Sequence, residues 1–194
     1  MSVWAVIPAK PVEEGKSRLA DVFTPQQRTR LNHYLFGNTL GIVCSVFPHG
    51  RVIVVSRDPA LLGIAAAAGA HALTEHGDDL NQALHQAADF PHLTGGLLAI
   101  SADLPNLIPD DLHAILAAPG RITIAPDRAG QGTNALLTTP AASIPYCFGA
   151  NSFARHSAEA ARLGIIPSII SRPGLAFDLD TPEDLGLCSH LIAG

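Results

Sequence analysis

The only two lysines of the chain lie in one loop, residues 8–19, directly after the first hydrophobic run. Lys10 and Lys16 stand six residues apart in this loop, and Arg18 follows them. A lysine ammonium is a compact point charge that suits phosphate oxygens. Loops that follow the strands of α/β proteins often bind ligands. The loop is therefore predicted to bind a phosphate, although solvated loops also collect lysines without any function.

Three aspartates in two further parts of the chain could bind a metal ion. Asp103 comes after the hydrophobic run 97–101, and Asp178 and Asp180 alternate in an extended segment, which puts them on one side of it. Mg²⁺ takes one or two carboxylates and fills its other positions with water and phosphate oxygens. We therefore predict that these aspartates hold Mg²⁺ beside the phosphate. The alternatives are that Asp103 caps the following turn and that Asp180 complements the dipole of a helix that begins after Thr181.

Two glycine-containing loops could bind a second anion. Residues 130–134 offer backbone N–H groups and the Thr133 hydroxyl. In residues 148–153, Ser152 is expected to start a helix, whose N-terminus favours a phosphate or a carboxylate. The alternatives are an ordinary turn and a helix cap without a ligand.

Composition excludes several classes of protein. A net charge of −5 gives no basic face for nucleic acid or a membrane surface. No segment approaches the roughly 20 apolar residues of a membrane span, and the N-terminus does not resemble a signal peptide. Cys44, Cys147 and Cys188 are odd in number and widely spaced, which indicates neither disulfides nor a zinc site. We expect a cytoplasmic protein that binds neither nucleic acid nor membranes.

Acid–base motifs are equally scarce. The nine histidines show no i, i+4 pair and are expected to be structural or at the surface, with His156 nearest to a candidate loop. The chain has neither the nucleophile motif of α/β-hydrolases nor the P-loop motif of nucleoside triphosphatases.

Strand-like and helix-like segments alternate along the chain, and most of the strands are apolar at consecutive positions, as in strands buried on both faces. The expected strands are residues 3–7, 51–56, 97–101, 122–125, 135–138 and 168–171. The expected helices are residues 25–46, 59–69, 79–89, 110–116, 152–163 and a last one from 182. This alternation predicts one α/β domain, residues 1–194, with a mostly parallel sheet, helices on both faces in three layers, and ligands beyond the carboxyl ends of the strands.

Several short motifs, in this order and spacing, resemble the 2-phospholactate guanylyltransferase family over nearly the full length. They are residues 8–11, 16–19, 79–84, 102–105, 132–136, 148–153 and 178–182. The resemblance implies a Rossmann-like, glycosyltransferase-A-like nucleotidyltransferase that joins GTP to a small phosphorylated acid and releases pyrophosphate. It implies 2-phospho-L-lactate, phosphoenolpyruvate or 3-phospho-D-glycerate as the acid, and a place in coenzyme F-420 biosynthesis. A homodimer is left open as the assembly.

The resemblance also assigns roles to residues. The positions that match the acid-binding motif are Thr133, Gly149 and Ser152. Those that match the metal motif are Asp103, Asp178 and Asp180, with Mg²⁺ as the cofactor. Lys10, Lys16 and Arg18 match the nucleotide motif, Asn81 is a further expected nucleotide contact, and Lys16 and Asp103 are the expected catalytic residues.

A phosphomonoester has a second pKa near 6, so the phosphate of such an acid is largely dianionic at neutral pH and can attack GTP without a general base. This explains how an active site could lack a histidine base.

Two other functions stay open from the sequence. One is another nucleotidyl- or glycosyltransferase of the same fold, such as a molybdopterin guanylyltransferase, although residues 9–11 lack the glycine-rich loop usual there. The other is a regulatory module that binds a nucleotide without turning it over.

Overall fold

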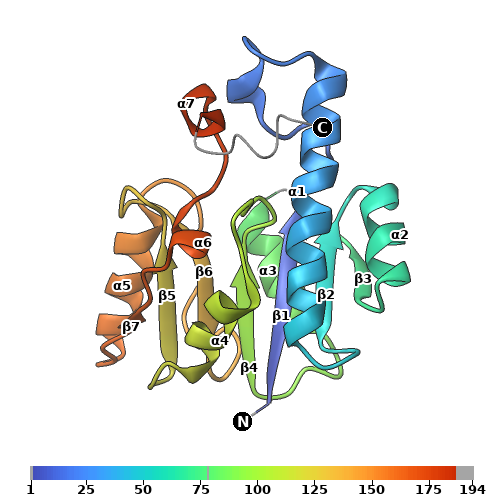
Figure 1. Ribbon diagram of the computed structural model, residues 1–194. Helices are drawn as coiled ribbons and strands as arrows, with labels where there is room; N and C mark the ends of the chain where they lie inside the picture. The colour runs from blue at the N-terminus through green and yellow to red at the C-terminus, as the bar shows by residue number, and fades with distance from the viewer. Residues whose placement is uncertain (1, 78, 187–194) are drawn as a thin grey trace.

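Seven strands form one sheet in the order β3-β2-β1-β4-β6-β5-β7 in the computed structural model, which describes residues 2–77 and 79–186 (Figure 1). All neighbouring strands pair in parallel except β6, which is antiparallel to β4 and β5. The mostly parallel α/β sheet predicted from the sequence is thus confirmed. The strands are β1 (Val3–Ala9), β2 (Val52–Ser56), β3 (His71–Thr74), β4 (Gly96–Ile100), β5 (Ile122–Pro126), β6 (Thr133–Thr138) and β7 (Ser168–Ile169).

Helices cover both faces of the sheet and make the three expected layers. One hydrophobic cluster packs residues of α1, α2, α4 and α6 against one face, and a second packs residues of α3 and α5 against the other. The helices are α1 (Pro25–Val46), α2 (Pro59–Ala67), α3 (Leu80–Ala88), α4 (Pro109–Ala117), α5 (Ser152–Arg162), α6 (Pro173–Ala176) and α7 (Pro182–Leu185).

The central strands form where the sequence is continuously apolar. Every residue of β2 and β4 is buried, because helices pack on both faces of the sheet. The sequence analysis missed β3, an edge strand of four residues that is only half-buried. An edge strand contacts the core weakly, so its residues show no hydrophobic run.

Helix ends follow the expected local signals. Thr24 and Gln27 form a capping box at the start of α1, in which the Thr24 hydroxyl accepts from the Gln27 N–H at 3.3 Å. After α2, Gly69 takes a left-handed conformation with φ +80°, which glycine adopts without steric cost. Since these signals are local, the helix limits were predictable from the sequence.

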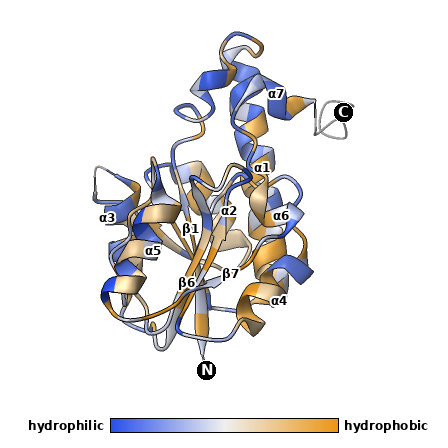
Figure 2. Ribbon diagram, turned by 90° about the vertical axis from the view of Figure 1, so that its left-hand side faces the viewer, coloured by the Kyte–Doolittle hydropathy of each residue, from blue (hydrophilic) through white to orange (hydrophobic). Residues whose placement is uncertain are grey.

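A third, smaller hydrophobic cluster lies outside the two main layers. The first part of α1, the loop before it and α7 extend beyond the carboxyl edge of the sheet (Figure 1). Figure 2 shows hydrophobic residues along the strands and mostly hydrophilic ones in this projecting part. Leu19, Leu35, Phe177 and Leu179 are buried together there. Burying a large apolar side chain stabilises by roughly 1.5–3 kcal/mol, so this cluster fixes the loop before α1 against residues 177–185.

In the described part of the chain, no helix is long and apolar enough to cross a membrane. Cys44 and Cys147 are free thiols. Cys188 and the end of the predicted domain, residues 187–194, lie outside the described residues.

Candidate active site

A cavity of about 770 Å³ opens at the carboxyl ends of β1 and β4 and at the amino end of the antiparallel β6. This is the edge where ligands of open α/β sheets bind. The cavity is lined by the loops that follow β1 and β4, by residues 131–134 and 148–152, and by Asp178 and Asp180. It therefore brings together most of the loops that the sequence analysis singled out.

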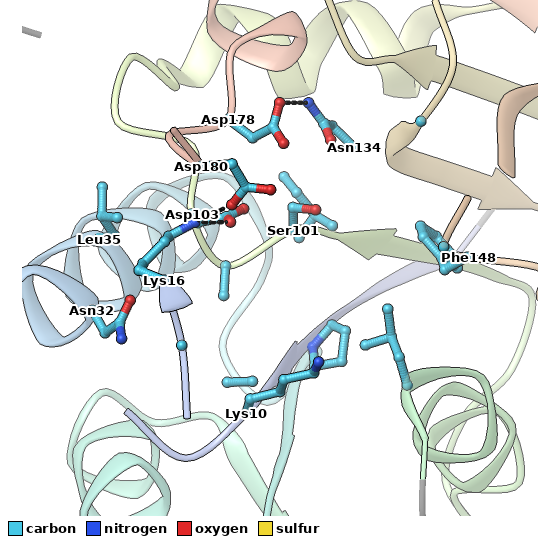
Figure 3. A pocket seen from close by; sticks show the side chains of 18 of the residues that line it. Lys10, Lys16, Asn32, Leu35, Ser101, Asp103, Asn134, Phe148, Asp178 and Asp180 are labelled. Carbon is cyan, nitrogen blue, oxygen red and sulfur yellow. Dashed lines mark hydrogen bonds and ion pairs between the residues drawn. The ribbon is translucent and has the colours of Figure 1, made fainter. Parts of the chain in front are cut away.

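Lys16 lies at the centre of the charged part of this cavity (Figure 3). Its side chain is only 5% exposed, and its Nζ donates to a carboxylate oxygen of Asp103 and, at 2.8 Å, to Oδ1 of Asp180. Burial by itself would lower the pKa of the Lys16 ammonium, but the two carboxylates outweigh it, and the pKa is raised. Lys16 is thus a fixed positive charge at neutral pH.

The loop that carries Lys16 is anchored to two helices. The Asn32 side chain of α1 donates to the Val12 carbonyl at 2.6 Å, and the Val12 N–H donates to the Asp58 carboxylate at 3.2 Å. A Cβ atom on Gly15 would lie 2.5 Å from Nδ2 of Asn32, which is closer than real contacts allow. Gly15 therefore permits the close approach of the loop to α1. Lys16 itself takes the left-handed conformation, with φ 57°.

A backbone hydrogen bond holds the segment of Asp178 and Asp180 beside Asp103. The Leu179 N–H, between these two aspartates, donates to the Asp103 carbonyl at 3.3 Å. The Asn134 side chain donates to Asp178 at 3.3 Å, as Figure 3 shows. Burial, and next the charge of Asp103, raise the pKa of the Asp178 carboxyl. The charge of Asp103 thus adds to the cost of burying the ionised Asp178 carboxylate.

These three carboxylates fit a magnesium ion that arrives with a nucleotide. Within residues 2–77 and 79–186, no group of three or more His, Cys, Asp or Glu side chains is arranged so that it could hold a metal ion by itself. Mg²⁺ does not need one, since it keeps several waters and binds through one or two carboxylates plus substrate phosphates. Asp103 and Asp178 offer such hard oxygen ligands beside the cavity. The donor set thus suits Mg²⁺ rather than a softer metal.

The other end of the cavity holds the residues expected to bind the acid. Thr133 is the first residue of β6, Ser152 is the first residue of α5, and both are almost fully buried while lining the cavity. Gly149 has φ +112°, a conformation that favours glycine, and its carbonyl accepts from the Ser152 N–H at 3.1 Å. The Phe153 N–H donates to the Gln131 carbonyl at 3.1 Å and so joins the two loops.

His156 supports this end of the cavity, a role that the sequence analysis did not assign. The Cys147 N–H donates to Nε2 of its fully buried ring at 2.9 Å. The proton of the neutral ring must then lie on Nδ1, which donates to the Thr133 hydroxyl oxygen at 3.1 Å. Because its oxygen accepts from His156, the Thr133 hydroxyl keeps its own proton for a partner in the cavity. His156 lies three residues beyond a loop that the sequence did single out, but only the fold shows its two partners.

Acid should destabilise the protein through His156. Burial, and then the charge of Arg155, lower the pKa of His156 to about 4, whereas an unfolded histidine titrates near 6.5. The neutral His156 ring therefore makes its full contribution to the free energy of unfolding above pH 6.5. This contribution is lost as the pH falls from 6.5 to 4. It amounts to about 3 kcal/mol. We expect the free energy of unfolding, measured by urea denaturation, to fall more steeply over this range for the wild type than for His156→Gln. Parallel pH profiles for the two proteins would contradict this expectation.

Of the other expected nucleotide contacts, Lys10 and Asn81 lie apart from this charged group, and Arg18 lies at its exposed side. Lys10 is exposed at the end of β1 and lines the cavity away from Lys16 (Figure 3). Arg18 is 73% exposed, with Nη1 3.9 Å from Oδ2 of Asp180. Asn81 is not among the lining residues of the cavity. Its side chain accepts from the Phe148 N–H at 2.7 Å and donates to the Phe148 carbonyl at 3.3 Å, so it holds the loop before Gly149.

Comparison with known protein families finds one match along almost the whole chain. The family described as guanylyl transferase CofC like matches residues 3–191. The chain is 40% identical over 190 residues to the phosphoenolpyruvate guanylyltransferase of Rubrobacter xylanophilus, covering 95% of this chain and 92% of that protein. It is 41% identical over 199 residues to the phosphoenolpyruvate guanylyltransferase of Sphaerobacter thermophilus, covering 100% and 96% of the two chains.

Solved structures of low sequence identity share the fold. A nucleotidyl transferase from Methanothermobacter superimposes with a TM-score of 0.69 at 15% identity, covering 98% of this chain and 97% of that one. The 4-diphosphocytidyl-2C-methyl-D-erythritol synthase of Anaerococcus prevotii superimposes with a TM-score of 0.62 at 9% identity, covering 99% and 96%. At such identities the likeness concerns the fold alone.

Proposed function

Since the chain belongs to the guanylyl transferase CofC-like family, we propose that it transfers the guanylyl group of GTP to the phosphate of a small phosphorylated three-carbon acid. The candidate acids are phosphoenolpyruvate, 2-phospho-L-lactate and 3-phospho-D-glycerate, and the pathway is coenzyme F-420 biosynthesis. The observation that carries the proposal is the buried Lys16 ammonium between Asp103 and Asp180, at the edge of a cavity large enough for two phosphorylated substrates. We place phosphoenolpyruvate first, because the two relatives described above are named for it.

In the proposed reaction, a phosphate oxygen of the acid attacks the α-phosphorus of GTP. The bond from this phosphorus to the oxygen of the β-phosphate breaks, and pyrophosphate leaves. The second pKa of the acid's phosphate is near 6, so the attacking oxygen already carries a negative charge at neutral pH. The enzyme therefore needs no general base and acts by positioning and by stabilising charge. This fits the cavity, since no histidine is among its lining residues in the described part of the chain, and His156, which supports the Thr133 end, has both ring nitrogens bonded to the protein.

Lys16 is proposed to stabilise the negative charge that develops between the α-phosphorus and the leaving pyrophosphate. A preorganised cation in a partly water-excluded site stabilises such charge more strongly than a solvated one. Lys16 meets this condition, since it is 5% exposed and held by two carboxylates. Lys10 and Arg18 are exposed and are proposed to contact the triphosphate from the solvent side.

Asp103, with Asp178 or Asp180, is proposed to hold Mg²⁺. When bound, the ion would neutralise the phosphate oxygens of both reactants and align them. Burial and, next, the charge of Asp103 raise the pKa of Asp178, and a cation beside the aspartates would stabilise its ionised form against both.

Thr133, Gly149 and Ser152 are proposed to bind the acid. The hydroxyl proton of Thr133 faces the cavity once its oxygen has accepted from His156. The N–H groups of Ser152 and Phe153 already donate to the Gly149 and Gln131 carbonyls, so α5 would favour an anion through the partial positive charge of its N-terminus and not through these two donors. A carboxylate or phosphate of the acid would meet the Thr133 hydroxyl and this N-terminus at this end of the cavity.

The test is to incubate the purified protein and Mg²⁺ with each of the four ribonucleoside triphosphates and each of the three acids, and to measure pyrophosphate. We expect release with GTP and with phosphoenolpyruvate above the other acids. Adding all three acids together and weighing the products by mass spectrometry ranks them under competition. Folded protein that releases no pyrophosphate under any combination would refute the proposed function.

A further inference from the structure

Charged side chains form a row along the edge of the sheet where the cavity opens. Glu75 follows β3, Arg57 follows β2, Lys10 follows β1 and Asp103 follows β4. The sheet order β3-β2-β1-β4 places these ends side by side, one strand spacing apart (Figure 1). Adjacent strands are separated by roughly 4.8 Å, so Glu75 lies about three spacings from Asp103. A nucleotide with its phosphates near Lys16 and Asp103 can therefore extend along the row towards Glu75.

The Glu75 carboxylate lies in a second, small cavity that borders the large one. This small cavity measures about 30 Å³ and shares Pro8, Ala9, Lys10 and Leu80 with the large cavity. This is room for about two water molecules, so at most the polar edge of a ring, and not the whole ring, would enter it. The apolar side chains of Val55, Leu80 and Ala83 line it beside the carboxylate. The site thus combines an apolar surface with the Glu75 acceptor, and the charged residues Lys10, Arg57 and Asp79 complete its lining.

Glu75 keeps acceptor capacity for a ligand. Its side chain is 9% exposed, and its ion-pair partner among the described residues is Arg57, whose Nε lies 3.5 Å away. Arg57 also contacts Glu14, at 3.3 Å through Nη2. Burial raises the pKa of the Glu75 carboxyl, Arg57 opposes this, and the charges of Glu14 and Asp79 add to it. Hydrogen bonds from further N–H donors would stabilise the ionised form of such a buried carboxylate.

The backbone around Glu75 is fixed before any ligand binds. The Glu75 N–H donates to the Ser56 carbonyl at 3.0 Å. The Gln86 side chain of α3 donates to the Thr74 carbonyl at 2.7 Å and accepts from the His76 N–H at 3.1 Å, so it holds both neighbours of Glu75. A preorganised acceptor discriminates between ligands better than a mobile one.

Of the four common bases, guanine alone presents two adjacent N–H donors on its Watson–Crick edge, namely N1–H and the 2-amino group. Adenine and cytosine present a ring acceptor next to their amino group, and uracil presents one N–H between two carbonyls. A carboxylate accepts two hydrogen bonds side by side but repels a ring acceptor. We infer that Glu75 selects guanine by accepting hydrogen bonds from N1–H and the 2-amino group of GTP, in the small cavity beside the proposed triphosphate site. This inference rests on the proposed function and adds the basis of its nucleotide choice.

The test compares kcat/KM for GTP, ATP and ITP in the wild type, in Glu75→Gln and in Glu14→Gln. ITP differs from GTP only in lacking the 2-amino group. A hydrogen bond to a charged group contributes about a 10-fold to 100-fold preference, so we expect the wild type to prefer GTP over ITP by this factor. Glu75→Gln should lower kcat/KM for GTP by about 10² and bring the GTP to ITP ratio near one. Glu14→Gln removes the other carboxylate partner of Arg57 and should keep the wild-type ratio.

A second measurement needs no variant. GTP methylated at N1 cannot donate from that position, and the wild type should use it at least 10-fold less well than GTP. Equal use of GTP, ITP and N1-methyl-GTP by the wild type would overturn the inference, and so would a Glu75→Gln protein with the wild-type ratio. Either result, together with wild-type pyrophosphate release from GTP, would leave the proposed function standing. Wild-type protein that neither binds nor turns over GTP would overturn both.

Discussion

Replacing Lys16 by methionine is expected to lower kcat with GTP and the acid by about 10² to 10³, or roughly 3–4 kcal/mol of transition-state stabilisation. The buried ammonium is held between Asp103 and Asp180, whereas Arg18, which also lies near Asp180, is 73% exposed and is a weaker substitute for it. Methionine keeps the length of the side chain while removing its charge. Steady-state pyrophosphate release measures the effect.

Lys10 provides the matched control for this substitution. It belongs to the same loop and lines the same cavity, but it is exposed. A solvated charge contributes less to the stabilisation of a transition state. We therefore expect Lys10→Met to raise KM for GTP and to change kcat by less than about 10-fold. If both variants lose activity to the same extent while circular dichroism shows folded protein, the special role of Lys16 is wrong.

Asp103→Asn is expected to lower kcat/KM by about 10² or more and to raise the Mg²⁺ concentration needed for half-maximal turnover. The amide keeps the size of the side chain but removes the charge that pairs with Lys16 and that would attract the ion. The measurement is turnover as a function of Mg²⁺ concentration at saturating GTP.

Asp110 offers the same substitution away from the cavity. It lies in the first turn of α4, and its side chain is 79% exposed. Asp110→Asn should leave turnover and its Mg²⁺ dependence within about 2-fold of the wild type, as is usual for surface substitutions. An Asp103→Asn protein with the Mg²⁺ dependence of the wild type would speak against metal binding by this carboxylate.

The fold was largely predictable because its signals are local. Continuous apolar runs mark the buried strands, and Thr24 with Gln27 marks the start of α1. That Asp103 follows a buried strand could be read from the sequence for the same reason. The antiparallel direction of β6 could not, because it depends on how the chain returns to the sheet after β5.

The candidate site was predictable only in part, because its contacts join distant residues. The sequence placed Lys10 and Lys16 in one loop, but the Lys16 side chain is buried beside Asp103 and Asp180, whereas Lys10 is exposed. The partners of His156 lie on β6 and in the loop before α5, and neither is adjacent to it in the sequence. Cytoplasmic location and a homodimer are predictions from the sequence that still await a test.

The central claim is that the phosphate of the acid attacks the α-phosphorus of GTP at the Lys16 centre, and isotope labelling tests it most directly. Phosphoenolpyruvate carrying ¹⁸O in its phosphate is incubated with GTP, Mg²⁺ and the wild-type protein, and the products are analysed by ³¹P NMR and mass spectrometry. The account predicts one unlabelled pyrophosphate for each diphosphate that joins guanosine to the acid, with all the label in that diphosphate. Label found in the pyrophosphate would contradict the account. Formation of GDP and inorganic phosphate, with no pyrophosphate, would contradict it as well.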